Sequence, residues 1–183
     1  LKHTLIPGTS RLFLDYLYHF DRVAGYFDWN PFQSESFHQA AQQIRYPVQR
    51  RGAMVEALRK QNPGAASLDI LADENSVAVV TGQQVGLFSG PAYTIYKAIT
   101  AVRLAKRLAD EGLRAVPIFW LATEDHDLEE VDHAWVFGPK AGAPVRLQAH
   151  MDATGGPVGE VVLGDVPLAQ LEQSLDGFPY AAD

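Results

Sequence analysis

The sequence predicts an α/β protein built on a βαβ unit with a parallel sheet. Three observations lead to this fold class. Residues 76–80 form a short β-branched apolar run, typical of a strand buried on both faces. A glycine-rich segment and a long helical pattern follow over residues 81–112, and residues 115–121 form a second apolar run. A strand, a crossover helix and a second strand in this order are expected to pair in parallel, with a right-handed crossover.

The N-terminal region, residues 1–75, is expected to be helical and to pack on this core. Phe13, Leu17, Phe20, Ala24 and Phe27 recur at helical spacing and predict one helix with a buried stripe. The many aromatic residues of this region are interpreted as packing residues.

Proline and capping residues divide the rest of the helical region. Asn30-Pro31 and Pro47 interrupt the pattern, and Ser34 is a plausible N-cap for a helix between them. Asn62-Pro63-Gly64 is a strong stop for the next helix, and Ser67 is a plausible cap for a short one.

The crossover helix has clear boundaries. Pro91 suits its first turn, and Gly112 suits its exit. Along it, residues 95, 99, 102 and 105 (Ile, Ile, Val, Ala) share one apolar face. The core is therefore expected to span residues 76–138.

Residues 139–183 are interpreted as the start of a connecting insertion. Strands are expected at residues 145–149 and 158–163, separated by a turn at residues 154–157, and a helix at residues 165–175. A short apolar segment at residues 135–137 precedes them and ends at Gly138-Pro139.

Composition excludes several classes of protein. The 15 Lys+Arg against 22 Asp+Glu give a net charge of −7, which argues against nucleic-acid and anionic-membrane partners. With no cysteine there is no disulfide framework, no thiolate nucleophile and no Cys-based metal site. No apolar run approaches the roughly 20 residues of a membrane span, and no signal-peptide pattern is present. We therefore expect a cytoplasmic protein.

The glycine segment, residues 81–90, is the first candidate for binding chemistry. It joins a strand end to a helix start, where unpaired N–H groups and the helix dipole favour an anion. Gln83, Gln84 and Ser89 offer side-chain donors, and Lys97 lies about two turns into the helix. The alternative is a glycine turn that only lets strand and helix pack closely.

The second candidate is the acidic segment that follows the second strand, residues 122–133. His126 between Asp125 and Asp127 is suited to general acid–base work. In open α/β sheets ligands bind beyond the carboxyl ends of the strands, so both segments are expected to open onto one edge. If residues 127–133 are helical, the pairs 126/130 and 129/133 share faces at a spacing that could hold a divalent metal. The alternative is a solvated acidic helix start.

Two tyrosines follow the glycine segment closely in the sequence. Tyr93 and Tyr96 share a helix face, and core packing is favoured more for Tyr96 than for Tyr93.

Both segments resemble one known family. Residues 81–97 (TGQQVGLFSGPAYTIYK) and 117–130 (PIFWLATEDHDLEE) are similar to two long motifs of the bacillithiol biosynthesis cysteine-adding enzyme family, in the same order and with matching spacing. The resemblance covers residues 76–134.

The resemblance implies a fold and an activity. The fold is a Rossmann-like nucleotide-binding core with connecting insertions and a C-terminal coiled coil that dimerises the full-length protein. The activity is a ligase that adds cysteine to glucosaminyl-malate in the last step of bacillithiol synthesis. ATP is expected as the activating nucleotide, with no metal beyond Mg²⁺ carried by that nucleotide.

The family motifs also supply the candidate site residues. Lys97, Asp125 and His126 are the catalytic candidates. The substrate- or nucleotide-binding candidates are Gln83, Gln84, Gly86, Ser89, Gly90, Tyr93, Thr94, Glu124 and Asp127.

Two other functions stay open on the residues alone. One is a non-catalytic nucleotide- or sugar-binding module, and the other is a metal-dependent hydrolase of a sugar conjugate, centred on Asp125, His126 and Glu130. The chain is shorter than a full family member, so we expect an N-terminal fragment with half a site, inactive alone and prone to self-association through its open sheet edge.

Overall fold

The computed structural model describes residues 3–138, 142–152 and 156–179. It divides into two compact units, each described by itself. The N-terminal unit contains Leu1–Val77 and Asp110–Arg114, and the second unit contains Ala78–Ala109 and Ala115–Asp183.

The N-terminal unit is helical, as predicted. Its helices are η1 (His3–Leu5), α1 (Arg11–Tyr18), η2 (Phe20–Arg22), α2 (Ser34–Gln43), α3 (Val48–Gln61) and α4 (Ser67–Ala72). Helices α3 and α4 pack through Val55, Leu68 and Leu71, which are at most 4% exposed.

The predicted single helix across Phe13–Phe27 is wrong. Helix α1 ends at Tyr18, because His19 leaves helical geometry with φ −143° and ψ 53°. The chain then turns through η2, and the aromatic side chains meet across the turn instead of along one helix face: the ring centroids of Tyr16 and Phe27 lie 4.8 Å apart. The predicted buried stripe is also wrong, because Phe13 and Phe27 are 43% and 38% exposed.

The predicted cap at Ser34 is also wrong. Helix α2 begins at Ser34 itself, and Gln33 is its N-cap without a side-chain hydrogen bond. The Ser34 hydroxyl also donates to the Glu111 carboxylate at 3.3 Å. Helix α3 starts after Pro47, as predicted. The short helix α4 is also present, but it begins at Ser67, the predicted cap, and Ala66 is its N-cap.

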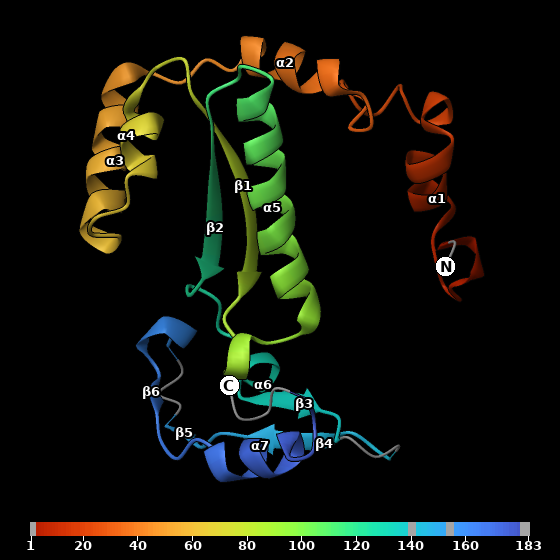
Figure 1. Ribbon diagram of the computed structural model, residues 1–183, viewed down its shortest axis with the longest axis vertical. Helices are drawn as coiled ribbons and strands as arrows, with labels where there is room; N and C mark the ends of the chain where they lie inside the picture. The colour runs from red at the N-terminus through yellow and green to blue at the C-terminus, as the bar shows by residue number, and fades with distance from the viewer. Residues whose placement is uncertain (1–2, 139–141, 153–155, 180–183) are drawn as a thin grey trace. The chain divides into compact units, whose positions relative to one another are not determined.

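The second unit contains the predicted βαβ core. Strand β1 (Val77–Gln84) and strand β2 (Ala115–Ala122) pair in a two-stranded sheet, joined by α5 (Ala92–Asp110). Figure 1 shows β1 and β2 running in the same direction beside α5, so the predicted parallel sheet is confirmed. Strand β1 is longer than predicted and carries the chain as far as Gln84.

The apolar face of α5 is not the predicted one. Ala101, Ala105 and Leu108 are its buried residues. Ile95 and Ile99, predicted to share the packed face with Ala105, are 55% and 42% exposed. The predicted helix exit is confirmed, since α5 ends at Asp110 and Gly112 follows with a φ of +89° that favours glycine.

The remaining elements of the second unit are short. They are η3 (Leu87–Ser89), α6 (Leu128–Val131), β3 (His133–Val136), β4 (Val145–Gln148), β5 (Met151–Asp152), η4 (Val158–Glu160), β6 (Val162–Leu163) and α7 (Leu168–Leu175). Strands β3 and β4 pair antiparallel, with His133 opposite Gln148, and β5 pairs antiparallel with β6.

Two predictions for this region need correction. The predicted strand at residues 158–163 is mostly wrong, because residues 158–160 form the turn η4 and only Val162–Leu163 are extended. The predicted helix at residues 165–175 begins later, at Leu168 after Pro167. Most of the predicted turn at residues 154–157 lies outside the described residues. Among the described helices, none is both long and apolar enough to cross a membrane.

Candidate functional site

The glycine segment folds back on itself directly after β1. A side chain at Gly86 would place its Cβ 2.9 Å from the Gly90 Cα atom, so this close approach requires glycine. Phe88 and Ser89 have positive φ values of 52° and 73°, and Gly90 has a φ of 67°. Three consecutive residues with positive φ make the loop a strained element, and backbone strain of this kind concentrates at functional sites.

The first turn of α5 borders a pocket of about 410 Å³. Gln84, Gly86, Ser89 and Thr94 supply its polar lining, while α5 and β2 supply apolar side chains. The Thr94 hydroxyl oxygen is buried, and no described residue forms a hydrogen bond with it. This pocket therefore offers a polar end at the glycine segment and an apolar wall, an arrangement that suits a small organic ligand.

Lys97 lies against the end of β1. Its Nζ atom donates to the Gly82 carbonyl oxygen at 3.1 Å and to Gln83 Oε1 at 2.8 Å, and it lies 5.2 Å from the centre of the Tyr93 ring. Gln83 Nε2 donates to the Tyr93 hydroxyl at 3.1 Å. The hydrogen-bond acceptors of Lys97 are neutral, so its charge is available to an anion. Tyr96, for which we favoured core packing, is 70% exposed.

Gln84 connects the glycine segment to the acidic segment. Its Nε2 atom donates to Asp125 Oδ2 at 2.7 Å and to Glu130 Oε2 at 2.8 Å. We call Asp125 and Glu130 the carboxylate pair. The predicted meeting of the two segments at one sheet edge is therefore confirmed by direct contacts.

Asp125 is held as a carboxylate. The hydrogen bond from the Gln84 side chain, followed by those from the backbone N–H groups of His126 and Asp127, lowers the pKa of Asp125 below its ordinary value of 3.8. A group with a lowered pKa is a weak proton acceptor. Asp125 is thus better suited to hold a positive charge than to remove a proton.

The turn η4 fixes the backbone on which Asp125 sits. The Val158 N–H donates to the Asp125 carbonyl oxygen at 2.7 Å, and the Gly159 N–H donates to the Thr123 carbonyl oxygen at 2.9 Å. A Cβ at Gly159 would lie 2.8 Å from the Thr123 Cβ, so glycine allows this close contact. Sequence reasoning missed this role of residues 158–159, because backbone contacts between distant segments leave no local motif.

The other acidic candidates lie differently from the carboxylate pair. Glu124 turns back along β2 and accepts a hydrogen bond from Trp120 Nε1 at 3.2 Å. His126 and Asp127 contribute their backbone N–H groups to Asp125, and both residues are exposed.

The predicted helix over residues 127–133 is too long. Helix α6 ends at Val131, so Glu129 and His133 do not share a helix face. His133 starts β3, and its Nδ1 atom lies 2.8 Å from Asp132 Oδ1. Among the described residues, no group of three or more His, Asp and Glu side chains could hold a metal ion.

The end of β1 brings charges of opposite sign near each other. Gln83 contacts Lys97 and Tyr93, and Gln84 contacts the carboxylate pair. The two amides meet, with Gln83 Nε2 donating to Gln84 Oε1 at 3.2 Å. Such a site can bind an anionic group near Lys97 and an ammonium group near Asp125 and Glu130.

Comparison with known proteins gives a consistent result. Residues 1–181 match the family model described as "Bacillithiol biosynthesis BshC, N-terminal Rossmann-like domain". A protein of Solibacter usitatus named "Putative cysteine ligase BshC" is 48% identical over 183 residues, which are all of this chain and 35% of that protein. A protein of the same name from Desulforamulus reducens is 31% identical, over 93% of this chain and 31% of its own length. Another from Salinibacter ruber is 39% identical, over 84% of this chain and 30% of its own length.

These similarities extend the motif resemblance from residues 76–134 to the whole chain. The chain spans about a third of the length of these curated relatives. By its sequence and its parallel βαβ core, the chain belongs to the bacillithiol biosynthesis BshC family, of which it represents the N-terminal Rossmann-like domain.

Proposed function

We propose that this domain carries part of the active site of a ligase that joins cysteine to the amine of glucosaminyl-malate, the last step of bacillithiol synthesis. The observation that carries the proposal is the contact of Gln84 with both Asp125 and Glu130. It brings the glycine segment and the acidic segment, each from a different part of the chain, to one place. The name of the relatives, cysteine ligase, supports the reaction class.

The carboxylate pair is proposed to receive the sugar amine. An amine in water at neutral pH is largely an ammonium ion, and two carboxylates that share one neutral amide leave net negative charge for it. Asp125 stays ionised because its pKa is lowered. Its role in this proposal is to bind and orient the amine.

His126 is the proposed proton acceptor. Imidazole is the side chain that most often performs acid–base catalysis, and the exposed His126 directly follows Asp125 in the segment between β2 and α6. The bound ammonium ion first releases one proton to water and becomes a free amine. The amine nitrogen then bonds to the acyl carbon of activated cysteine, the bond from that carbon to its leaving group breaks, and the second proton passes from the nitrogen to His126. The products are the amide and the departing group.

Lys97 and the start of α5 are proposed to serve the acyl side. Joining a carboxylate to an amine is uphill in water, and ATP as co-substrate would supply the energy by turning the carboxylate into a reactive phosphate anhydride. The residues of this region suit such a co-substrate. Among the described residues, Lys97 donates only to neutral acceptors, and the buried Thr94 hydroxyl has no hydrogen-bond partner. Gly86 and Gly90 allow a ligand to approach the backbone closely. Mg²⁺ would enter only with the nucleotide.

The relatives are about three times as long as this chain. We therefore propose that further residues of the complete gene product complete the site. Dimerisation through a coiled coil belongs to that complete protein and is likewise a proposal.

The test is a mass-spectrometric assay of the complete gene product with cysteine and glucosaminyl-malate, with and without ATP. The expected product has the summed mass of the two substrates minus one water, and it forms only with ATP. Nucleotide binding without any product would support a binding module instead. Metal-dependent cleavage of glucosaminyl-malate would support a hydrolase, and either result would contradict the proposal.

Residue roles are tested in the same assay. His126→Ala is expected to lower kcat by about 10²-fold or more with little change in KM, as loss of a general base does. Lys97→Ala is expected to raise the KM for ATP or cysteine. Unchanged rates in both variants would remove these residues from the proposed mechanism. His19→Ala is the control, because His19 lies in the N-terminal unit between α1 and η2.

A further inference from the structure

The N-terminal unit contains a pocket that is separate from the candidate ligation site. Its volume is about 450 Å³, and its lining comes from α2, the segment between α2 and α3, α3, and residues 74–77 and 113. The ionisable side chains that line it are His38, Arg45, Tyr46, Arg51 and Glu74. Two of these are guanidinium groups, which are always charged in proteins.

Arg51 is a buried cation with neutral acceptors. It is 7% exposed, its Nη1 atom donates to the Leu71 carbonyl oxygen at 2.9 Å and to Ser76 Oγ at 3.1 Å, and its Nη2 atom donates to the Ser76 carbonyl oxygen at 3.3 Å. No carboxylate of the described residues lies within 4.0 Å of it in an ion pair. Asp73 acts on this guanidinium only from beyond ion-pair distance, since the charge of Arg51 is the last of the causes that lower the pKa of Asp73. A buried charge without a directly paired counter-charge is costly, so the guanidinium can accept an anion.

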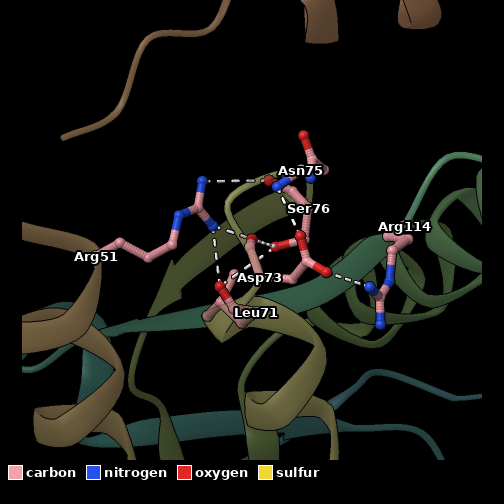
Figure 2. A network of polar contacts seen from close by, with 6 residues as sticks. All are labelled: Arg51, Leu71, Asp73, Asn75, Ser76 and Arg114. Carbon is pink, nitrogen blue, oxygen red and sulfur yellow. Dashed lines mark hydrogen bonds and ion pairs between the residues drawn. The ribbon is translucent and has the colours of Figure 1, made fainter. Parts of the chain in front are cut away.

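One edge of the Arg51 guanidinium has unused donors. The Nε atom is buried and has no hydrogen-bond partner among the described residues, and Nη2 uses one of its two N–H groups. Nε and Nη2 together form the side-on fork with which arginine binds a carboxylate or a phosphate through two parallel hydrogen bonds. In Figure 2 the dashed contacts leave from the two terminal nitrogens, and Nε lies on the side away from Leu71 and Ser76.

The nearby acidic groups do not fill this role. Asp73 accepts a hydrogen bond from the Asn75 N–H at 2.8 Å through Oδ1, and its Oδ2 atom pairs with Arg114 (Figure 2). His38 pairs with Glu111, with its Nε2 atom 3.3 Å from Glu111 Oε2. Glu74 is an exposed residue that lines the pocket, and no ion pair joins it to Arg45 or Arg51 among the described residues.

Arg45 strengthens the positive character of the pocket. Its Nη1 atom donates to the carbonyl oxygens of Gln42 and Ile44, both neutral. The Tyr46 ring centre lies 5.7 Å from Arg51 Cζ, and Tyr46 is 43% exposed.

We propose that this pocket binds a small oxyanion, a carboxylate or a phosphate group, between Arg45 and the Nε–Nη2 edge of Arg51. Arg51 holds the anion by two parallel hydrogen bonds, and Arg45 supplies the second positive charge. The site belongs to the N-terminal unit and does not depend on the ligase proposal.

The test is a titration of this chain with inorganic phosphate, and separately with acetate, at constant ionic strength set with sodium chloride. The readout is the NMR signal of the Arg51 Nε–H group together with the backbone amides of residues 74–76. The expected result is a saturable shift with a Kd of about 10 mM or lower for at least one of the two anions. The anion that binds more tightly identifies the ligand as a phosphate or a carboxylate.

Variants separate a site from general charge effects. Arg45→Gln, at an exposed position, is expected to weaken binding about tenfold, and Arg51→Lys is expected to abolish it because lysine keeps the charge but lacks the fork. Arg50→Gln is the matched control, because Arg50 is an exposed α3 residue outside the pocket lining.

Three results would overturn the proposal. They are shifts that do not saturate, shifts that chloride reproduces, and binding by Arg45→Gln as tight as that of the unchanged chain. The Arg45 variant decides the question even if Arg51→Lys fails to fold.

Discussion

Gln84 is the residue on which the candidate site depends. Its amide nitrogen contacts both members of the carboxylate pair, and the hydrogen bond to Asp125 is the largest cause of the lowered pKa of that group. The Gln84 side chain thus keeps two anions together and keeps one of them ionised. The neighbouring Gln83 accepts a hydrogen bond from Lys97 through its amide oxygen.

Gln84→Ala is predicted to raise the pKa of Asp125, because the carboxylate loses its strongest hydrogen bond while the like charge of Glu130 remains near. The measurement is an NMR titration of the Asp125 side-chain carboxyl carbon. Gln148→Ala is the control, because Gln148 donates a similar hydrogen bond at 2.7 Å to another aspartate, Asp132. A pKa of Asp125 that is the same in Gln84→Ala and the unchanged chain would show that the contact has no electrostatic role.

At the scale of elements, the pairing of β1 with β2 depends on one glycine. A Cβ at Gly82 would lie 2.9 Å from the Trp120 carbonyl oxygen and 3.0 Å from the Trp120 Cβ. These contacts are with backbone and the base of a side chain, which cannot move without shifting β2. Gly82 therefore sets how closely the two strands, and with them Gln84 and Asp125, approach each other.

Gly82→Ala is predicted to lower the free energy of unfolding by about 1–3 kcal/mol, because overpacking forces the strands apart. Gly52→Ala is the matched control. Gly52 lies inside α3, and a Cβ there would meet no atom within 4 Å, so alanine is predicted to raise stability by about 0.5–1 kcal/mol. Denaturant unfolding of both variants gives the two values, and equal effects of the same sign would contradict this account of the strand contact.

The element scale also shows what the sequence can and cannot predict. The βαβ core was predictable because the apolar runs, the glycine segment and Pro91 are local signals. The end of α1 at Tyr18 was not, because the aromatic residues keep helical spacing beyond the point where the backbone turns. The exposed Ile95 and Ile99 show the same limit, since periodicity identifies an apolar face but not which residues are covered.

The candidate site was predictable to a similar extent. The motifs placed Gln84 and Asp125 at one sheet edge, which the rule for parallel strands requires. The contribution of η4 was not predictable, because the Val158 and Gly159 backbone contacts join segments more than 30 residues apart without any side-chain signature. The contacts of Gln83 with Lys97 and of Gln84 with the carboxylate pair were not predictable either, because β1 continues to Gln84, beyond the predicted strand.

At the scale of the whole molecule, two aspartates link stability to acid pH. Hydrogen bonds lower the pKa of Asp125, and the Asn75 backbone N–H, with Arg114, lowers the pKa of Asp73. At pH values around 3.8, the ordinary pKa of an aspartate, both groups bind fewer protons in the folded chain than in the unfolded chain. Their contribution is therefore present above that pH and is lost as the pH falls through the folded-state pKa values.

The double variant Asp73→Asn/Asp125→Asn is accordingly predicted to be less stable than the unchanged chain at pH 7, with a smaller loss of stability between pH 5 and pH 3. Thermal unfolding across this pH range measures both effects. Asp165→Asn, at an exposed position of the second unit, is the control and should follow the unchanged chain. Parallel pH curves for the double variant and the unchanged chain would contradict the prediction.

The central claim is that the carboxylate pair held by Gln84 serves cysteine ligation. The most direct test is the rate of product formation in a single turnover by the complete gene product, at glucosaminyl-malate concentrations below saturation, for Asp125→Asn and for Asp165→Asn. The predicted result is at least an approximately tenfold lower rate for Asp125→Asn, because the amine loses a charged hydrogen-bond partner, and an unchanged rate for Asp165→Asn. A folded Asp125→Asn protein that forms product at the full rate would contradict the claim.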